Sequence, residues 1–459
     1  MEVKQMLNAT SKNLYERKAL RVNPAKTCQP VGAMYAALGV HKCLPHSHGS
    51  QGCASYHRSV LSRMFKEPAM ASTSSFTEGA SVFGGGANLK TAVKNILSLY
   101  DPEIIAIHTT CLSETIGDDL PSYIREIDIP EKKYIVHANT PSYQGSHVTG
   151  FSAMTKAFVS YLSERSGTAN GKVNIIPGFV SPADMRELKR LLKIMNVPFI
   201  ILPDTSGVFD APTLSGYEMY PAGGTKIDDI IDAGNSKYTI ALGNYASESA
   251  AIELEKKCDI KFRTLMAPIG VEATDRFITM ISRIFDIDIP YEITEERGQL
   301  VDLMIDSHQY FYGKRVAIAG DPDLVIAFTQ FIVELGMIPK YVITGTPGEL
   351  FEKRVKEILE KANIQGSFVK ASSDLFELHQ RIKNDGVDLL LSGSYGKYIS
   401  RAENIPFVRF GFPILDRYGH QYIPDYGYRG AINLIIKISN ALLDKMDREC
   451  PEEDFEAIR

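Results

Sequence analysis

Cysteine is the residue type in this chain best suited to chemistry, and its distribution is uneven. Four of the six cysteines, Cys28, Cys43, Cys53 and Cys111, lie in the first quarter of the 459 residues. Six are too few for a disulfide scaffold, and the polar start of the chain does not resemble an export signal. We therefore expect reduced thiols in a cytoplasmic protein, and a reduced thiol can bind a metal as its thiolate. No pair has the C-x-x-C spacing of zinc ribbons and ferredoxins.

Three of these cysteines stand at predicted helix starts. Cys28 precedes a Gln-Pro pair, and proline is typical of the first turn of a helix. Cys53 ends a short polar loop and begins an amphipathic stretch, whereas Cys111 directly follows the predicted strand Ile104–Thr110. Unpaired N–H groups and the positive end of the helix dipole favour a thiolate and an anionic cluster there. Gly52 would let a bulky inorganic group approach the backbone. The residues alone thus indicate a thiolate cluster site.

Two other interpretations of these cysteines stay open on the residues alone. Free cysteine is among the most buried residue types, so the thiols could be ordinary core residues. A zinc site is the second interpretation, because histidines and cysteines crowd into one short segment, although none has the usual paired spacing. Histidines in a polar loop are also commonly just solvated. The crowded residues are His41, Cys43, His46, His48, Cys53 and His57.

The elements that must position these residues follow a repeating pattern from about residue 100. A short apolar, β-branched run is followed by a loop and then by an amphipathic helical stretch such as Ala183–Met195 or Leu324–Leu335. Such short apolar runs are typical of buried parallel strands, whose carboxyl ends gather ligands. The predicted strands are Ile104–Thr110, Tyr134–Thr140, Lys172–Pro177, Pro198–Pro203, Tyr238–Gly243, Arg315–Gly320, Tyr341–Gly345, Val387–Ser392 and Pro406–Phe410. The expected fold class is α/β, with three doubly wound Rossmann-like domains and mostly parallel sheets.

The chain is too long for one hydrophobic core, so we expect several domains. They are an N-terminal arm at 1–20, an α/β domain at 21–165 that carries the clustered cysteines, a second α/β domain at 166–295, and a third at 296–459 that ends in a helix. A formal charge of −5 gives no basic footprint for nucleic acid. The sequence has no apolar run of about 18 residues, so no membrane span is expected.

The motifs Thr27–Ala33, His48–Cys53 and Thr109–Asp119 around the cysteines resemble those of the nitrogenase molybdenum–iron protein β subunits. The match begins near residue 20 and covers essentially the whole chain, so the long N-terminal extension of some members is expected to be missing. The matching motifs are Thr27–Ala33, His48–Cys53, Phe83–Gly85, Thr109–Asp119, Thr140–Ser142, Gly145–Gly150, Gly320–Asp323 and Phe407–Pro413.

This resemblance implies an α2β2 assembly with an eight-iron, seven-sulfur P-cluster at each α–β boundary. By motif, Cys28, Cys53 and Cys111 would be the cluster ligands of this subunit, and Ser50 and Gly52 would belong to the cluster loop. Ser142 falls where the family has a serine that can bind iron upon oxidation. Without the resemblance, Ser142 is interpreted as a turn or cap residue.

The resemblance also implies a mononuclear cation, calcium or iron, between subunits. Its ligands would match Glu67, Asp302 and Asp306, with a backbone contribution near Lys66. Asp302 and Asp306 are four residues apart on a predicted helix and share one face, and carboxylate oxygens suit such hard cations. On the residues alone, a solvated helix face is the ordinary interpretation.

A further position, Phe83, resembles a family residue on the surface where the iron protein docks. An exposed aromatic side chain there would serve as a contact anchor. The alternative is a phenylalanine of the core.

The implied function is electron relay within nitrogenase, with no catalytic residue in this subunit. An ATP-hydrolysing iron protein would dock transiently and pass electrons through the P-cluster to an iron–molybdenum cofactor in the α subunit, where dinitrogen is reduced to ammonia. This chain lacks the G-x-x-x-x-G-K-[ST] phosphate loop, consistent with nucleotide binding by the iron protein.

Three alternative functions stay open at this point. One is the β subunit of a vanadium or iron-only nitrogenase, because the distinguishing cofactor lies in the α chain. Another is a nitrogenase-like scaffold for cofactor assembly. The third is a nucleotide- or sugar-binding α/β protein, which would leave the clustered cysteines without a role and lacks the G-x-G-x-x-G fingerprint.

Overall fold

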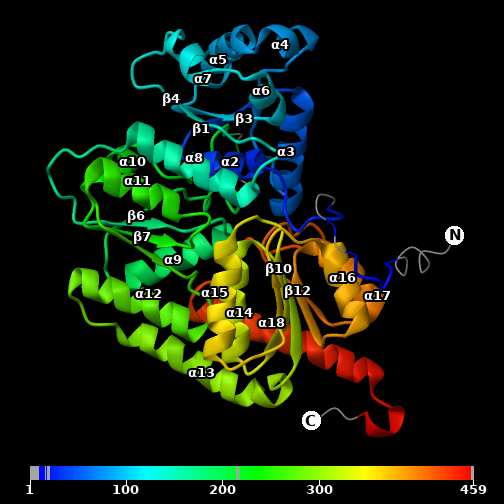
Figure 1. The fold of residues 1–459 in the computed structure, drawn as a ribbon. Coiled ribbons are helices and arrows are strands. Elements are labelled where there is room, and N and C mark those ends of the chain that lie inside the picture. The colour runs from blue at the N-terminus through cyan, green and yellow to red at the C-terminus, as the bar shows by residue number, and fades with distance from the viewer. Residues whose placement is uncertain (1–9, 16, 18–20, 213–215, 217, 456–459) are drawn as a thin grey trace.

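Three parallel sheets with helices around them make up the protein (Figure 1). The computed structural model describes residues 10–455 except 16, 18–20, 213–215 and 217. The first sheet has the order β2-β1-β3-β4, the second β6-β5-β7-β8 and the third β11-β10-β9-β12-β13. Every strand pair within these sheets is parallel, so the predicted fold class is confirmed.

The three sheets fall one into each of the segments 21–165, 166–295 and 296–459. The strands are β1 (Cys43–His48), β2 (Ser72–Thr73), β3 (Ile104–Thr109), β4 (Tyr134–Ala138), β5 (Val173–Ile176), β6 (Phe199–Ile201), β7 (Tyr238–Leu242), β8 (Phe262–Leu265), β9 (Arg315–Gly320), β10 (Ile338–Thr344), β11 (Phe368–Lys370), β12 (Leu389–Ser392) and β13 (Phe407–Arg409).

Helices alternate with these strands, as expected for doubly wound sheets. The helices are α2 (Gln29–Leu38), α3 (Gln51–Phe65), α4 (Glu78–Phe83), α5 (Gly86–Tyr100), α6 (Cys111–Ile116), α7 (Leu120–Arg125), α8 (His147–Leu162), α9 (Pro182–Ile194), α10 (Ile227–Asp232), α11 (Glu248–Cys258), α12 (Gly270–Phe285), α13 (Tyr291–Phe311), α14 (Pro322–Glu334), α15 (Glu349–Lys361), α16 (Leu375–Asn384), α17 (Lys397–Glu403) and α18 (Gly427–Glu449).

The central helix of the first domain, α2, is buried along its whole length. It packs against α8 so closely that side chains larger than hydrogen do not fit at two positions. A Cβ atom on Gly32 would lie 1.7 Å from the His147 carbonyl oxygen, and one on Gly150 would lie 1.9 Å from the Gln29 carbonyl oxygen. Glycine at these positions therefore allows backbone-to-backbone contact and fixes the start of α2 against the start of α8.

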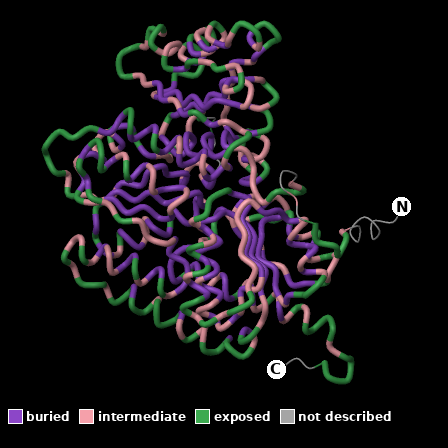
Figure 2. The backbone as a smooth tube through the Cα atoms, in the orientation of Figure 1, coloured by how far each residue is buried: buried purple, intermediate pink, exposed green. Residues whose placement is uncertain are grey.

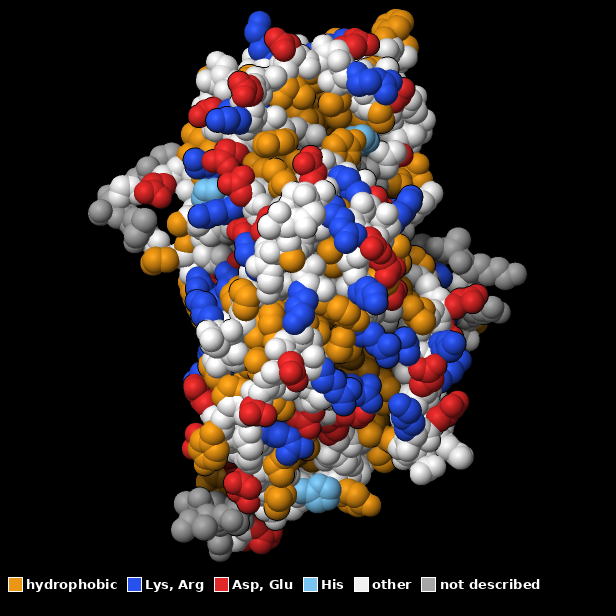
Figure 3. Space-filling model, turned by 90° about the vertical axis from the view of Figure 1, so that its left-hand side faces the viewer, with side chains coloured by type: hydrophobic (Ala, Val, Ile, Leu, Met, Phe, Trp, Pro, Cys, Tyr) orange, Lys and Arg blue, Asp and Glu red, His pale blue; other side chains and the backbone are white. Residues whose placement is uncertain are grey.

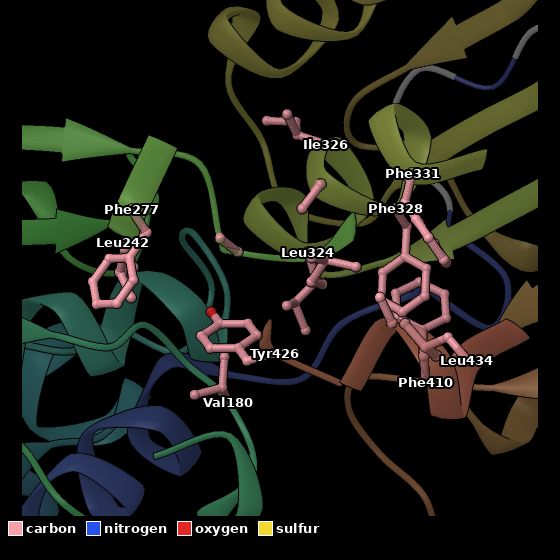
Figure 4. Close-up of a cluster of buried hydrophobic side chains, with 14 of the residues drawn as sticks. Val180, Leu242, Phe277, Leu324, Ile326, Phe328, Phe331, Phe410, Tyr426 and Leu434 are labelled. Carbon is pink, nitrogen blue, oxygen red and sulfur yellow. The ribbon is translucent and has the colours of Figure 1, made fainter. Parts of the chain in front are cut away.

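One large hydrophobic core spans the second and third sheets and their helices. Figure 4 shows Leu242 and Phe277 on one side of this core, Phe328 and Phe410 on the other, and Tyr426 between them. The rings of Phe328 and Phe410 lie 4.1 Å apart between centroids. Buried segments follow the strands through each sheet, whereas exposed residues concentrate on the outer helices (Figure 2). The shared core joins these two sheets into a common body.

The surface carries charges of both signs between hydrophobic side chains on the face shown in Figure 3. Among the described residues, no helix combines the length and apolar character needed to cross a membrane. Much of the predicted arm, 1–9, 16 and 18–20, lies outside the described residues. The arm's described part packs on the third domain, where Gln380 donates a hydrogen bond to the Asn13 carbonyl and Arg17 pairs with Asp374.

The structure contains four strands that the sequence pattern did not predict: β1, β2, β8 and β11. The most consequential is β1, whose sequence Cys-Leu-Pro-His-Ser-His lacks an apolar run, yet every residue of it is buried. The interpretation of its histidines as solvated loop residues was wrong. His46 and His48 are fully buried and contact the hydroxyls of Ser72 and Ser74.

Candidate metal centre

The three cysteines singled out by position lie at the amino ends of three helices in the first domain. Cys28 is the N-cap of α2, Cys53 is the third residue of α3, and Cys111 is the first residue of α6. All three are partly exposed, whereas Cys43 and Cys258 are buried. The predicted placement at helix starts is confirmed, and these thiols are not ordinary core residues.

The Cys53 thiol is coupled electrostatically to the Cys28 thiol and to the Cys111 thiol. Burial raises the pKa of the Cys53 thiol, a hydrogen bond from Ser50 lowers it, and the nearby Cys111 thiol raises it again. Burial also raises the pKa of the Cys28 thiol, and Cys53 contributes in the same direction. Binding of a metal would displace protons from these thiols.

The loop before Cys53 is attached directly to the helix that begins at Cys111. The hydroxyls of Thr110 and Ser113 both donate to the His48 carbonyl oxygen, at 3.2 and 2.8 Å. Thr110 and Ser113 also form the capping box of α6. Because β1 pairs with β3, the loops after these strands meet at one sheet edge.

The start of α2 is attached to the turn that contains Ser142. The Gln29 side-chain amide donates to the carbonyl oxygens of Pro141 and Gln144, at 3.2 and 3.3 Å. On the other side of this turn, the Thr140 hydroxyl donates to the Thr109 carbonyl at 2.7 Å. The Ser142 turn is thus held between the segments that carry Cys28 and Cys111.

Ser50 and Gly52 lie beside Cys53, as the cluster-loop prediction requires. Ser50 is the N-cap of α3, but its hydroxyl contacts the Cys53 sulfur at 3.7 Å instead of a backbone N–H. A Cβ atom on Gly52 would meet only the Ser50 hydroxyl, at 3.8 Å. The space next to Gly52 is open, so a bulky group can approach the backbone there.

The arrangement of the side chains that could bind metal shows whether a single ion or a larger cluster fits the site. Within the described part of the chain, no group of three or more His, Cys, Asp or Glu side chains is arranged to hold a metal ion. This finding does not support the zinc interpretation. Three thiols that interact, yet do not surround one ion, fit a larger cluster completed by ligands from another polypeptide. Their partial exposure fits the same arrangement.

A polar chain behind Cys28 was not predicted from the sequence. The Cys28 sulfur lies 3.7 Å from His57 Nε2, His57 Nδ1 lies 3.4 Å from Ser47 Oγ, and Ser47 Oγ lies 2.6 Å from His108 Nε2. Burial lowers the pKa of His57 to about 4 and that of His108 well below its ordinary value. No local sequence signal marks these residues as connected, since the contacts depend on strand pairing.

Two further predicted positions can be placed. Phe83 ends α4 with 90% of its surface exposed, beside Val82 at 74%, so the core interpretation of Phe83 is wrong. Asp302 and Asp306 are exposed on α13. Lys66 ends α3 and Glu67 follows it, and the Lys66 ammonium donates to the Leu415 carbonyl oxygen. Among the described residues, Glu67, Asp302 and Asp306 form no group that could hold a metal ion.

Comparison with known proteins decides the family. The model for the nitrogenase component 1 type oxidoreductases matches residues 28–443, which is most of the chain. The chain belongs to this family. The match begins at Cys28, the first of the three clustered cysteines.

Relatives within the nitrogenase component 1 family narrow the assignment. The chain is 65% identical to the nitrogenase molybdenum–iron protein beta chain of Clostridium pasteurianum, a match that covers 99% of this chain and 100% of the relative. It is 42% identical to the corresponding chain of Frankia alni, over 97% and 87% of the two chains. A solved structure described as "Nitrogenase Cp1 at pH 6.5" superposes with a TM-score of 0.98 at 65% identity, over 99% of this chain and 100% of that one.

The chain is accordingly a β-type subunit of nitrogenase component 1, with an α-type chain as its partner, in an oxidoreductase family that uses metal–sulfur clusters. The vanadium, iron-only and scaffold alternatives are not favoured. A second structure, "Nitrogenase Cp1 at pH 5", matches at 17% identity with a TM-score of 0.69 and shares the fold. The ligand, cation and docking residues stay predictions.

Proposed function

We propose that this subunit holds a P-cluster jointly with the α subunit and relays electrons through it toward dinitrogen reduction. The observation that carries the proposal is the placement of Cys28, Cys53 and Cys111 at the amino ends of three helices, with the Cys53 thiol electrostatically coupled to the other two. Partial exposure of all three residues leaves this group accessible to a second polypeptide.

The residues of this chain would hold the cluster as follows. Cys28, Cys53 and Cys111 would bind iron as thiolates, and the helix N-termini next to them favour the negative charge. Ser142 would add a hydroxyl ligand upon oxidation, with loss of its proton. Its hydroxyl makes no hydrogen bond to any described residue and is free to bind. When bound, the cluster supplies one-electron redox chemistry.

The surrounding structure would keep these ligands in fixed positions. The close contact of α2 with α8 and the attachment of the 48–53 loop to α6 leave little freedom for the segments that carry the thiols. A site on rigid elements holds its ligands precisely, which limits reorganisation when charge changes.

The partners and further cofactors follow from the same assignment. An ATP-hydrolysing iron protein would dock transiently at a surface that includes Phe83, and the iron–molybdenum cofactor would lie in the α subunit of a cytoplasmic α2β2 assembly. A calcium or iron ion would bridge two subunits through Glu67, Asp302, Asp306 and the backbone near Lys66. That Glu67, Asp302 and Asp306 form no metal-holding group among the described residues supports a site that needs more than one chain.

The proposed function is tested by metal analysis of the complex co-expressed with its α partner. Cys53→Ala and Cys111→Ala should each lose or destabilise the cluster iron, whereas Cys450→Ala, a partly exposed cysteine far from the site, should keep it. Full iron content and an unaltered cluster spectrum in both site variants would overturn the ligand assignment. The same analysis should find molybdenum; vanadium, or neither metal, would overturn the molybdenum assignment.

A further inference from the structure

The chain of contacts from Cys28 to His108 joins a proposed cluster ligand to the interior of the first sheet. His57 lies on α3, Ser47 on β1 and His108 on β3, and Ser47 and His108 are directly opposed in the parallel pairing of these two strands. Ser47, His57 and His108 are each almost completely buried. The contacts therefore belong to the folded core and not to mobile surface side chains.

Counting donors and acceptors shows in which direction the hydrogen bonds run along the contacts from His108 to Cys28. A neutral imidazole has one N–H and one bare nitrogen, and a serine hydroxyl has a single proton to donate. If Cys28 binds iron as a thiolate, its sulfur has no proton and can only accept, so His57 Nε2 must carry the hydrogen. His57 Nδ1 then accepts from Ser47, and Ser47 Oγ accepts from His108 Nε2–H.

His108, the last residue in this series of contacts, agrees with donation toward Cys28. His108 Nδ1 is buried and has no hydrogen-bond partner among the described residues. In the direction set by a thiolate, this atom is a bare acceptor. In the opposite direction it would be a buried N–H without a partner, and orphaned buried donors are the rarer case. A thiolate at Cys28 and an unpaired Nδ1 at His108 thus both favour donation toward Cys28.

We propose that His57 is a positioning residue that donates a hydrogen bond from Nε2 to the Cys28 sulfur and so raises the reduction potential of the bound cluster. The inference rests on the proposed function, because it needs Cys28 to be an iron ligand. A hydrogen bond to a ligand sulfur stabilises the more negatively charged, reduced cluster over the oxidised one. Ser47 and His108 fix the ring's tautomer, as partners of metal-ligating groups commonly do.

Substitutions at His57 separate the effect of the donated hydrogen bond from the effect of the ring's shape. His57→Phe keeps a ring of similar volume but has no N–H, and the smaller His57→Leu serves the same comparison should the phenylalanine variant not fold. His57→Gln carries an amide N–H at a similar distance from the backbone. His46→Phe is the matched control, since His46 is a buried imidazole on the same sheet that contacts Ser72 and Ser74.

The experiment is a redox titration of the αβ complex, followed by electron paramagnetic resonance, with iron analysis of each sample. His57→Phe and His57→Leu should keep the cluster iron and lower the equilibrium constant for its one-electron reduction about tenfold, a shift of about 59 mV to more negative potential. His57→Gln should retain most of the wild-type potential, and His46→Phe should retain all of it.

The possible results separate a failure of the role of His57 from a failure of the proposed function. An unchanged potential in iron-loaded His57→Phe or His57→Leu would overturn the role of His57. An equal shift in His46→Phe would also overturn it, because the effect would then come from general disruption of the sheet. Absence of a cluster from the wild-type complex would instead overturn the proposed function.

Discussion

The contact between α2 and α8 gives a quantitative prediction for Gly150→Ala. The added Cβ would lie 1.9 Å from the Gln29 carbonyl oxygen, whereas ordinary contacts begin at 3.4 Å. The two helices would have to separate by about 1.5 Å at this point, because the obstacle is backbone and not the end of a flexible side chain. The residue that would move is the neighbour of Cys28.

The energetic cost can be worked out from two opposing effects. Overpacking of a core costs about 1–3 kcal/mol, and a backbone obstacle in a fully buried helix places this case at the upper end. Replacing a helical glycine with alanine returns about 1 kcal/mol through helix propensity. The net loss of about 2 kcal/mol corresponds to a thermal midpoint lower by ~4–8 °C on the scale of a 150–250-residue domain.

Calorimetry and iron analysis of the complex would measure both consequences. We expect Gly150→Ala to lower the first unfolding transition and to reduce cluster iron, because the shift of Gln29 loosens the Ser142 turn as well as Cys28. Gly79→Ala is the control, since Gly79 is also helical and a Cβ there would meet only Thr77 Oγ1, at 3.9 Å. Wild-type stability and iron in Gly150→Ala, or equal losses in Gly79→Ala, would refute the packing argument.

Three further results are expected. Phe83→Ala should raise the half-saturating concentration of the iron protein about tenfold with unchanged cluster iron, whereas Leu99→Ala, 69% exposed, should not; equal effects would contradict the docking role. Asp302→Asn and Asp306→Asn should each lose the mononuclear cation in metal analysis, and an unchanged calcium and iron count would contradict the site. Burial raises the pKa of Asp323 to about 6. The folded state therefore holds this proton more tightly than the unfolded state, and the group's contribution to stability falls as pH rises from about 4 to 6. The stability advantage of wild type over Asp323→Asn should shrink across that range in thermal unfolding, and an advantage that grows would be contrary to this sign.

Local sequence signals were sufficient for the strands with a simple apolar pattern. The run Arg315–Gly320 was predicted with the bounds that β9 has, because Val-Ala-Ile-Ala is apolar and an Asp-Pro pair follows it. The opposite case is β1, which contains Pro45 and two histidines and lies inside its sheet. Its polar groups are satisfied by serines about 26 residues further along the chain, and no local pattern records that pairing.

The same division applies to the candidate site. The placement of Cys28, Cys53 and Cys111 at helix starts followed from residues next to each of them. The electrostatic coupling of Cys53 to Cys28 and Cys111 did not, because it depends on the pairing of β1 with β3 and on the packing of α2 against α8. The role inferred for His57 needed both contacts at once, since its two ring nitrogens face residues from different elements.

The most direct test of the central claim is anomalous X-ray diffraction at the iron absorption edge from crystals of the complex with the α subunit. We predict iron within bonding distance of the sulfurs of Cys28, Cys53 and Cys111, at the boundary between the two subunits. Crystals of the active complex in which these three sulfurs have no iron neighbour would contradict the account.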